Sequence, residues 1–225
     1  MTSRYSSPSD LPSTLPVFPL RGAILLPRAS LTLNVFEPRY LALIDHALAN
    51  DRLIGVIQPA ADTGSAESPQ GKDFPVRKVG CVGRITAFNE TEDRPLVISL
   101  SGIARFALGG EIASEVPFRT FTVDFTPYAD DFVSDLGEDD VDRVRLLETL
   151  RRYLDANGLN ADWERINAAA NEQLINTLSI LSPYGAEEKQ ALLEAGSLSE
   201  RAEALVALAE MELATRDDNS GTSLQ

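Results

Sequence analysis

The stretch LPVFPLRGAILLPRASLTLNVFEPRYLALIDHALANDRLIGVIQP, residues 15–59, changes its hydrophobic period several times and so outlines strands around a helix. Residues 28–36 alternate between apolar and polar side chains, which is typical of a half-buried strand. Pro16 and Pro19 each lack a backbone donor. We therefore expect residues 15–20 to form a strand at the edge of a sheet or at a strand end.

The alternation ends at Pro38, where apolar residues begin to recur at helical spacing. Proline fits the first turn of a helix, because its missing N–H would have no intrahelical partner there. This helix is expected to end near Asn50. Residues 52–58 then form an apolar run closed by Pro59, which predicts a buried strand.

The next part of the chain continues as short strands. Strand patterns cover residues 76–88, 96–101, 103–108 and 118–125, with Gly102 breaking the second run and a polar turn at 89–95 predicting a hairpin. Residues 60–74 carry Gly, Ser, Pro and charges without an apolar period, which indicates a flexible surface loop. This loop is either a tolerated insertion or a lid or partner-contacting loop. Several short strands and one early helix predict a curled, partly closed sheet over residues 15–135.

The pattern becomes helical after Pro127. Helical spacing of apolar residues predicts four helices, at 139–157, 163–181, 187–195 and from the Ser197-x-x-Glu200 capping box to about Thr215. Short connectors predict that the helices pack together as one helical part over residues 136–215. The two ends, 1–14 and 216–225, are polar and aperiodic and are expected to be disordered tails. The expected fold class is therefore α+β.

Charge and composition exclude some classes of protein. The net charge is −14 and the pI is about 4.5. Nucleic-acid affinity depends on clustered Lys and Arg, so RNA binding is disfavoured, although Arg77, Lys78 and Arg84 could form a local basic patch. No run is apolar over the roughly 18 residues needed to span a membrane, and residues 1–10 lack the apolar core of a signal peptide, so a cytoplasmic location without membrane contact is expected.

Residues that could support catalysis or metal binding occur singly. Cys81 is the sole cysteine and lies in an apolar strand pattern, which favours a buried thiol and excludes a disulfide within the chain. His46 is the sole histidine and lies on the polar side of the first helix without a second ligand nearby. We therefore expect no metal, no cofactor and no catalytic residue.

Three blocks of sequence, in order, resemble the substrate-binding domain of Lon-type ATP-dependent proteases. They are residues 15–59, FPVRKVGCVGRITAF with PLVISLSGIARFAL at 74–108, and 174–213, which contain EEKQALLEAGSLSERAEALVALAEMEL. The resemblance implies a PUA-like β-domain followed by a helical bundle that engages unfolded or tagged substrates.

The protease machinery itself is not found in the sequence. A phosphate-binding loop needs leading glycines before Lys and Ser or Thr, whereas Lys72 is followed by Asp73. A Lon-type peptidase pairs a serine with a lysine. The sequence has only Lys72, Lys78 and Lys189, and we expect no downstream domain that could present such a pair. A non-catalytic binding module is therefore expected.

Phe36, Arg39 and Tyr40 are the candidate protein-binding residues. They lie where the second strand meets the helix, and aromatic residues and Arg are enriched where proteins contact other proteins. The alternative is that Phe36 and Tyr40 belong to the core while Arg39 is exposed or paired with Glu37.

Two classes of function remain open. The chain could bind peptides or unfolded proteins on behalf of an ATP-dependent protease or a chaperone, or it could be an adaptor with one dedicated folded partner or a homodimer. Broad, weak binding would distinguish the first class from the single tight complex of the second.

Overall fold

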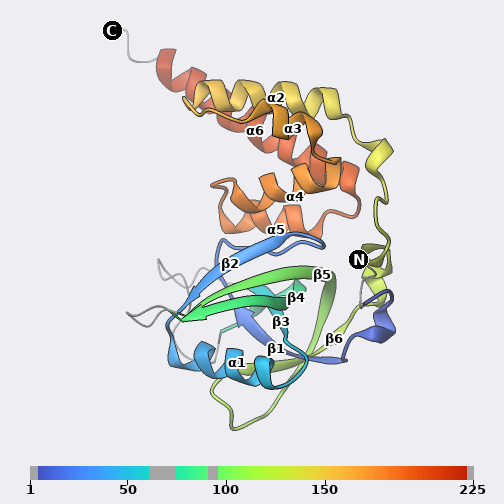
Figure 1. Ribbon diagram of the computed structural model, residues 1–225. Helices are drawn as coiled ribbons and strands as arrows, with labels where there is room; N and C mark the ends of the chain where they lie inside the picture. Colours follow the sequence, from blue (N-terminus) through green and yellow to red (C-terminus); the bar gives the residue numbers. More distant parts are fainter. Residues whose placement is uncertain (1–4, 61–73, 91–95, 222–225) are drawn as a thin grey trace. The chain divides into compact units, whose positions relative to one another are not determined.

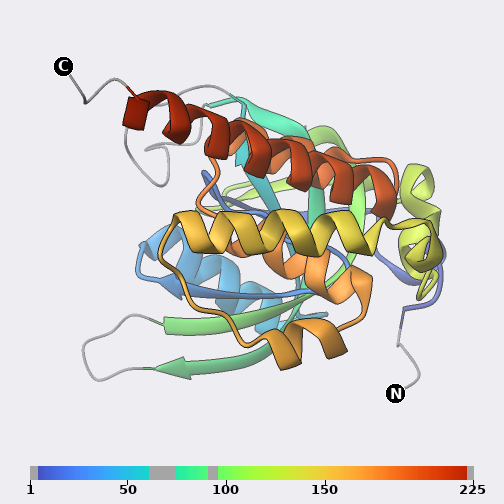
Figure 2. The ribbon, with the colours of Figure 1, turned by 90° about the horizontal axis from the view of Figure 1, so that it is seen from above.

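The computed structural model describes residues 5–60, 74–90 and 96–221, and these residues form two compact units. The first unit comprises residues 1–134 and 184–193, and the second comprises 135–183 and 194–225. Figures 1 and 2 show the sheet of the first unit and the helices of the second. The predicted α+β class is confirmed, and no helix in the described part of the chain is long and apolar enough to cross a membrane.

Six strands of the first unit form one sheet that closes on itself. The strands are β1 (Thr14–Pro19), β2 (Ser30–Val35), β3 (Leu53–Pro59), β4 (Val76–Glu90), β5 (Leu96–Ile112) and β6 (Arg119–Asp124). Their order is β2-β5-β4-β3-β1-β6, and a second pairing of β5 with β6 closes the ring. β1 and β3 are parallel, whereas every other neighbouring pair is antiparallel.

β1 lies inside the sheet rather than at its edge, whereas Pro19 is at a strand end, which was the other predicted position. It pairs with β3 on one side and with β6 on the other. The two prolines are tolerated because each falls in only one of the two registers: Pro16 pairs with Thr120 of β6, and Pro19 pairs with Ile57 of β3. A missing N–H is tolerated on a side where no ladder partner requires it.

Gly102 does not end a strand as predicted, because β5 continues through it. The backbone of residues 26–29 pairs with β5 here: Gly102 N–H donates to Ala29 O at 2.8 Å, and Arg28 N–H donates to Gly102 O at 2.9 Å. A Cβ atom at position 102 would lie 2.0 Å from Leu26 O. Glycine is therefore required here because another backbone approaches closely. In the sequence, a glycine with this role cannot be told from one that ends a strand.

Helix α1 (Pro38–Ala49) follows β2 and buries one side, as its periodicity predicted. Its buried residues are Tyr40, Leu43, Ile44 and Ala47. Cys81 is fully buried, as expected, and His46 is exposed, with its ring 5.2 Å from that of Phe118.

The chain before β1 is folded where it is described, in contrast to the predicted disordered tail over 1–14. Tyr5 and Leu11 belong to the same buried cluster as Leu15 and Phe106. Between them Pro8–Asp10 forms a short 3₁₀ helix whose start is fixed by Asp10, which accepts from Ser6 N–H at 2.8 Å and Ser7 N–H at 2.9 Å. Burial of Tyr5 and Leu11 is enough to order this Ser- and Pro-rich segment. Two apolar residues do not make a periodic pattern, so the sequence did not predict this.

Helix α5 (Ala186–Glu194) was predicted as a helix, and its residues up to Leu193 belong to the first unit. The chain therefore leaves the second unit, contributes α5 to the first and returns to the second. The sequence patterns had suggested one continuous helical part over 136–215. Where independently folding parts begin and end stays a prediction.

The second unit is helical. It contains α2 (Arg143–Ala156), α3 (Trp163–Ala168), α4 (Asn171–Leu181) and α6 (Leu198–Gly221), which extends beyond the expected end near Thr215. Figure 2 shows α2 and α6 running alongside one another. Ser197 caps α6 by accepting from Glu200 N–H at 3.1 Å, as the capping pattern predicted.

The single long helix predicted over 163–181 is two helices, because side chains from another segment cap both sides of the break. Glu138 accepts from Asn171 N–H at 2.8 Å and Glu172 N–H at 2.7 Å, which fixes the start of α4. Arg143 donates to the carbonyl oxygens of Ile166 and Asn167 at the end of α3. The apolar period runs through the break, so only the tertiary contacts reveal it.

We expect Glu138→Ala to lower the free energy of unfolding by about 1 kcal/mol, the usual cost of losing a helix cap. Circular dichroism during urea unfolding would measure the change. Asp139→Ala removes the exposed carboxylate next door and should change stability by less than about 0.5 kcal/mol. Equal effects of the two variants would show that Glu138 acts through general charge rather than through capping.

Candidate functional site

The structure separates the three predicted binding residues. Phe36 is 65% exposed, whereas Tyr40 is buried with its ring centroid 4.1 Å from that of Phe18. Arg39 pairs with Glu37 at 2.8 Å and lies 4.5 Å from the centroid of the Tyr40 ring. Tyr40 thus belongs to the core and Arg39 is held by its neighbours, which leaves Phe36 as the exposed member. A protein-binding role for these residues stays a prediction.

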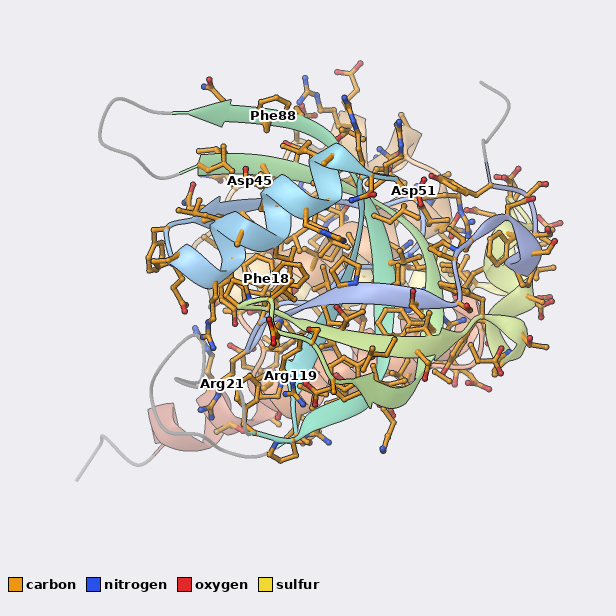
Figure 3. All side chains as sticks on the ribbon, turned by 90° about the horizontal axis from the view of Figure 1, so that it is seen from below. Phe18, Arg21, Asp45, Asp51, Phe88 and Arg119 are labelled. Carbon is orange, nitrogen blue, oxygen red and sulfur yellow. The ribbon has the colours of Figure 1, made fainter. Side chains whose placement is uncertain are left out.

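Phe88 is a second exposed aromatic residue, and the sequence reading did not select it. It lies near the end of β4 and is 53% exposed. Its position directly before the polar stretch 89–95, from which the sequence predicted a turn, was the available signal, because strand ends beside turns are often solvated. Residues 89 and 90 belong to β4, and residues 91–95 lie outside the described part of the chain. Figure 3 shows Phe88 on β4.

The end of β4 that carries Phe88 has an open edge. β3 pairs with β4 only as far as Arg84, whereas β5 pairs with β4 up to Glu90. Among the described strands, residues 86–89 therefore have a neighbour on one side only, and all four of these residues are exposed. We call residues 86–89 the β4 edge. An edge of this kind presents unpaired backbone N–H and C=O groups that can pair with another extended chain.

The β4 edge has two chemically different faces. Phe88 is opposite Ile98, which is opposite Leu33, so these three side chains share an apolar face. On the other face Ala87 is opposite Ser99, which pairs with Thr32, and Asn89 follows the same side. A chain that paired with this edge would meet a phenylalanine on one face and small or polar side chains on the other.

The charges on and beside α1 are mainly acidic. Asp45 is exposed on α1 and Asp51 is exposed just after it, and Figure 3 labels both residues. The segment after α1 contacts β4, because Arg52 O accepts from Ile85 N–H at 2.8 Å. Arg52 is also exposed. In the described part of the chain, no group of His, Cys, Asp and Glu residues is placed to hold a metal ion.

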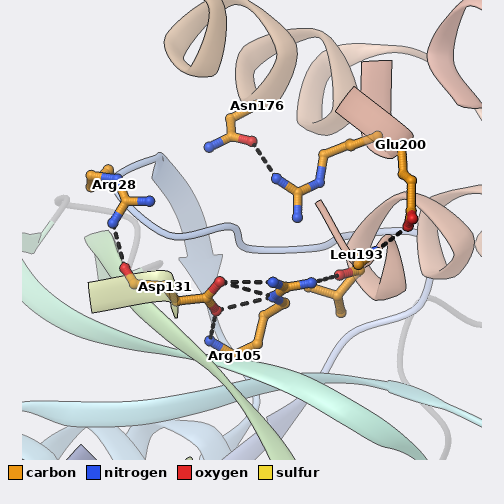
Figure 4. A network of polar contacts seen from close by, with 8 residues as sticks. Arg28, Arg105, Asp131, Asn176, Leu193 and Glu200 are labelled. Atoms are coloured by element: carbon orange, nitrogen blue, oxygen red, sulfur yellow. Dashed lines mark hydrogen bonds and ion pairs between the residues drawn. The ribbon is translucent and has the colours of Figure 1, made fainter. Parts of the chain in front are cut away.

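A buried ion pair fixes the other side of the first unit. Arg105 of β5 and Asp131 of the 3₁₀ helix Thr126–Phe132 form a two-pronged pair, with a closest distance of 2.8 Å and both side chains 7% exposed. Asp131 also accepts from Arg105 N–H at 2.7 Å, and Arg105 donates to Leu193 O in α5 at 3.3 Å (Figure 4). Burial lowers the pKa of Arg105, but the hydrogen bonds and charge of Asp131 offset this effect and leave the pKa raised. The guanidinium therefore stays charged, and the pair joins β5 to α5.

A second polar contact holds the start of α5. Gln58 of β3 donates to Ala186 O at 2.9 Å and to Gln190 Oε1 at 3.0 Å, and it accepts from Gly22 N–H at 2.9 Å. Gln190 in turn donates to Val79 O of β4. Each hydrogen-bonding group of the buried Gln58 amide is used, which is the arrangement expected when a polar group leaves water. We call these two contacts, at Arg105 and at Gln58, the α5 clasp.

The basic patch considered for RNA is weakened by pairing. Arg77 forms an ion pair with Glu187 of α5, while Lys78 is exposed and Arg84 is partly buried. One of the three cations is thus neutralised within the unit, which adds to the case against a surface that follows a phosphate backbone.

Comparison with protein families and known structures gives one consistent result. A family model described as the ATP-dependent protease La (LON) substrate-binding domain matches residues 14–210. The chain is 27% identical over 201 residues to a Lon protease of Flavobacterium johnsoniae, which covers 86% of this chain and 23% of that protein. It is 24% identical over 206 residues to Lon protease 2 of Thermus thermophilus, which covers 91% of this chain and 25% of that protein. The chain thus spans about a quarter of the length of these relatives.

Two solved structures share the fold. A Lon N-terminal domain protein from Xanthomonas campestris gives a TM-score of 0.57 at 22% identity, covering 86% of this chain and 97% of that one. The N-terminal domain of the Mycobacterium avium complex Lon protease gives a TM-score of 0.64 at 17% identity, covering 88% of this chain and 98% of that one. At this level of identity the likeness concerns the fold.

We expect Asp131→Ala to destabilise the first unit by about 3–5 kcal/mol, because it leaves the buried guanidinium of Arg105 without its partner. The double variant Arg105→Met with Asp131→Leu should cost less than Asp131→Ala, since no buried charge remains. Asp130→Ala, at an exposed neighbour, should be near neutral. Urea unfolding monitored by circular dichroism would measure all three, and an equal loss in the single and double variants would contradict this account.

We expect Lys189 to make stability rise with pH on the alkaline side. Burial lowers the pKa of Lys189 below its ordinary value of 10.5. Between the lowered pKa and 10.5 the unfolded chain binds more protons than the folded one, so the free energy of unfolding increases with pH. The free energy of unfolding of the wild type minus that of Lys189→Met should therefore increase as pH rises toward 10.5, because the variant has no amine to titrate at this position. A constant difference would mean that the amine titrates alike in both states.

Proposed function

Because the chain belongs to the family of ATP-dependent protease La (LON) substrate-binding domains, we propose that it recognises protein substrates as extended, unfolded segments, and that it binds them along the β4 edge. In this proposal the chain is a recognition module rather than a catalyst and needs no cofactor or metal. Its partners are unfolded proteins or peptides, together with an ATP-dependent protease or a chaperone in the cytoplasm that receives them.

The observation that carries the proposal is the run of four consecutive exposed residues, 86–89, in a strand whose ladder to β3 has ended at Arg84. Pairing to a strand edge uses backbone N–H and C=O groups, which every extended polypeptide has. A module that accepts many unrelated substrates needs affinity that does not depend on one sequence. Edge pairing provides such affinity, and it excludes folded proteins, whose backbone groups are already paired.

Exposed aromatic side chains add to the backbone contacts. Phe88 lies within the β4 edge, and Phe36 follows β2, which pairs with β5 alone among the described strands. Burying a phenylalanine against a bound chain contributes about 1.5–3 kcal/mol. In this proposal Phe36 remains a binding residue. Arg39 and Tyr40 instead stabilise the start of α1, through the ion pair with Glu37 and the contact with Phe18.

We expect Phe88→Ser to weaken binding of an unfolded protein by about tenfold, because the apolar contact of the ring is lost. The probe is fluorescently labelled α-lactalbumin, permanently unfolded by reduction and carboxymethylation, and the measurement is fluorescence anisotropy with the full chain. Phe36→Ser should weaken binding less, because Phe36 lies outside the β4 edge. Native, folded α-lactalbumin should compete poorly.

Val133→Ser is the matched control, because Val133 is an exposed apolar residue of the same unit, 49% exposed, that follows the 3₁₀ helix Thr126–Phe132 and does not belong to β4. It should leave the affinity unchanged, and circular dichroism should show that all three variants are folded. Equal affinities of the Phe88 and Val133 variants would place the site elsewhere. A stable homodimer or one tight complex with a folded protein, without affinity for unfolded α-lactalbumin, would make the chain an adaptor.

A further inference from the structure

We propose that the β4 edge selects extended segments in which apolar and polar side chains alternate, with basic rather than acidic residues at the polar positions. This inference rests on the proposed function, since it names the class of substrate that the same edge would take.

The alternation follows from the two faces of the edge. Successive side chains of a strand point to opposite faces of the sheet. Phe88 shares its face with the fully buried Ile98, so a neighbouring chain would place every second side chain on an apolar surface. Ala87 and Asn89 are exposed on the opposite face beside Ser99 and Val97, so the intervening side chains would remain in water. A segment with apolar residues in adjacent pairs would expose one of each pair on the polar face.

The length of the edge limits how much sequence is selected. Pairing of β3 ends at Arg84, and the ladder with β5 continues to Glu90. A bound chain can therefore pair with only a few residues before it meets β3. Selection over so few residues discriminates by pattern and charge, and it does not require a unique sequence.

The preference for basic residues follows from charge. Arg52 O accepts from Ile85 N–H at 2.8 Å, so the segment just after α1 lies against β4 where the β4 edge begins. The exposed carboxylates of Asp45 and Asp51 outnumber the exposed guanidinium of Arg52 there, and the whole chain carries a net charge of −14. An approaching acidic segment is repelled by this field, whereas Lys or Arg at the solvated positions of the segment is attracted to it. The occupant that fits both the faces and the charge is an unfolded segment with a β-type, basic pattern.

The experiment compares labelled peptides of equal length and composition by fluorescence anisotropy with the full chain. One peptide alternates Val or Tyr with Lys or Thr, and its isomer has the same residues in adjacent apolar and polar pairs. We expect the alternating peptide to bind about tenfold more tightly, because the isomer can bury only half of its apolar side chains. Equal affinities would overturn the proposed selection by pattern.

Two further readouts test the place and the charge. The alternating peptide should slow amide hydrogen exchange at residues 86–89, whereas binding without protection there would overturn the edge pairing. Asp45→Lys should weaken binding of the basic peptide by about twofold to fivefold and strengthen binding of a Glu-substituted version, as expected for exposed charge pairs. Asp155→Lys makes the same change in net charge on an exposed residue of α2 and should have a smaller effect. Equal effects of the two variants would overturn the local role of Asp45.

The outcomes separate this inference from the proposed function. If unfolded α-lactalbumin binds and Phe88→Ser weakens it, but both peptide isomers bind equally, the site stands and the pattern selection fails. If neither α-lactalbumin nor either peptide binds, both fail.

Discussion

The backbone pairing of β5 with three other strands is the constraint on which the rest of the first unit depends. Residues 96–101 pair with β2 on one side while residues 96–107 pair with β4 on the other, and residues 107–112 pair with β6. The register of β4 against β5 shifts at Gly102, where a side chain has no room because a Cβ atom would lie 2.0 Å from Leu26 O. The pairing with β6 closes the ring. The ladder of β4 with β5 continues to Glu90 whereas that with β3 stops at Arg84, and this difference leaves the β4 edge open.

The α5 clasp shows how polar side chains order a helix that is remote in sequence. Arg105 and Gln58 contact the two ends of α5 through backbone carbonyls, and their remaining hydrogen-bonding groups are satisfied within the same unit. A buried charge pair of this kind adds little net stability over apolar packing, but it penalises every arrangement in which one partner is missing. Such contacts specify which helix docks and in what orientation, while the apolar core supplies most of the stabilising free energy.

Membership of the substrate-binding family and the shape of the sheet both support the proposed recognition of extended segments. In the proposed mode a bound segment that adds a strand is recognised mainly through its backbone, so the binding energy would be shared by unrelated substrates. Side chains of the module would then modulate the choice: the exposed phenylalanine would favour apolar residues at alternate positions, and the carboxylates would disfavour acidic segments. No concave active site is needed for this task, which accords with the scattered positions of Cys81, His46 and the lysines in the sequence.

The sequence by itself determined the elements that have a strong local period or cap. The alternation at 28–36, the start of α1 at Pro38 and the Ser197 cap of α6 all depend on neighbours within a few residues, and each was predicted. The tertiary structure alone decided the interior position of β1, the passage of β5 through Gly102, the break before α4 and the exposure of Phe88. Each of these depends on a partner distant in sequence: the β6 ladder, the Leu26 backbone, the Glu138 carboxylate and the point where β3 ends. A local sequence pattern does not depend on where such a partner lies. The sequence therefore predicted Phe36 as a member of the candidate site and did not predict Phe88.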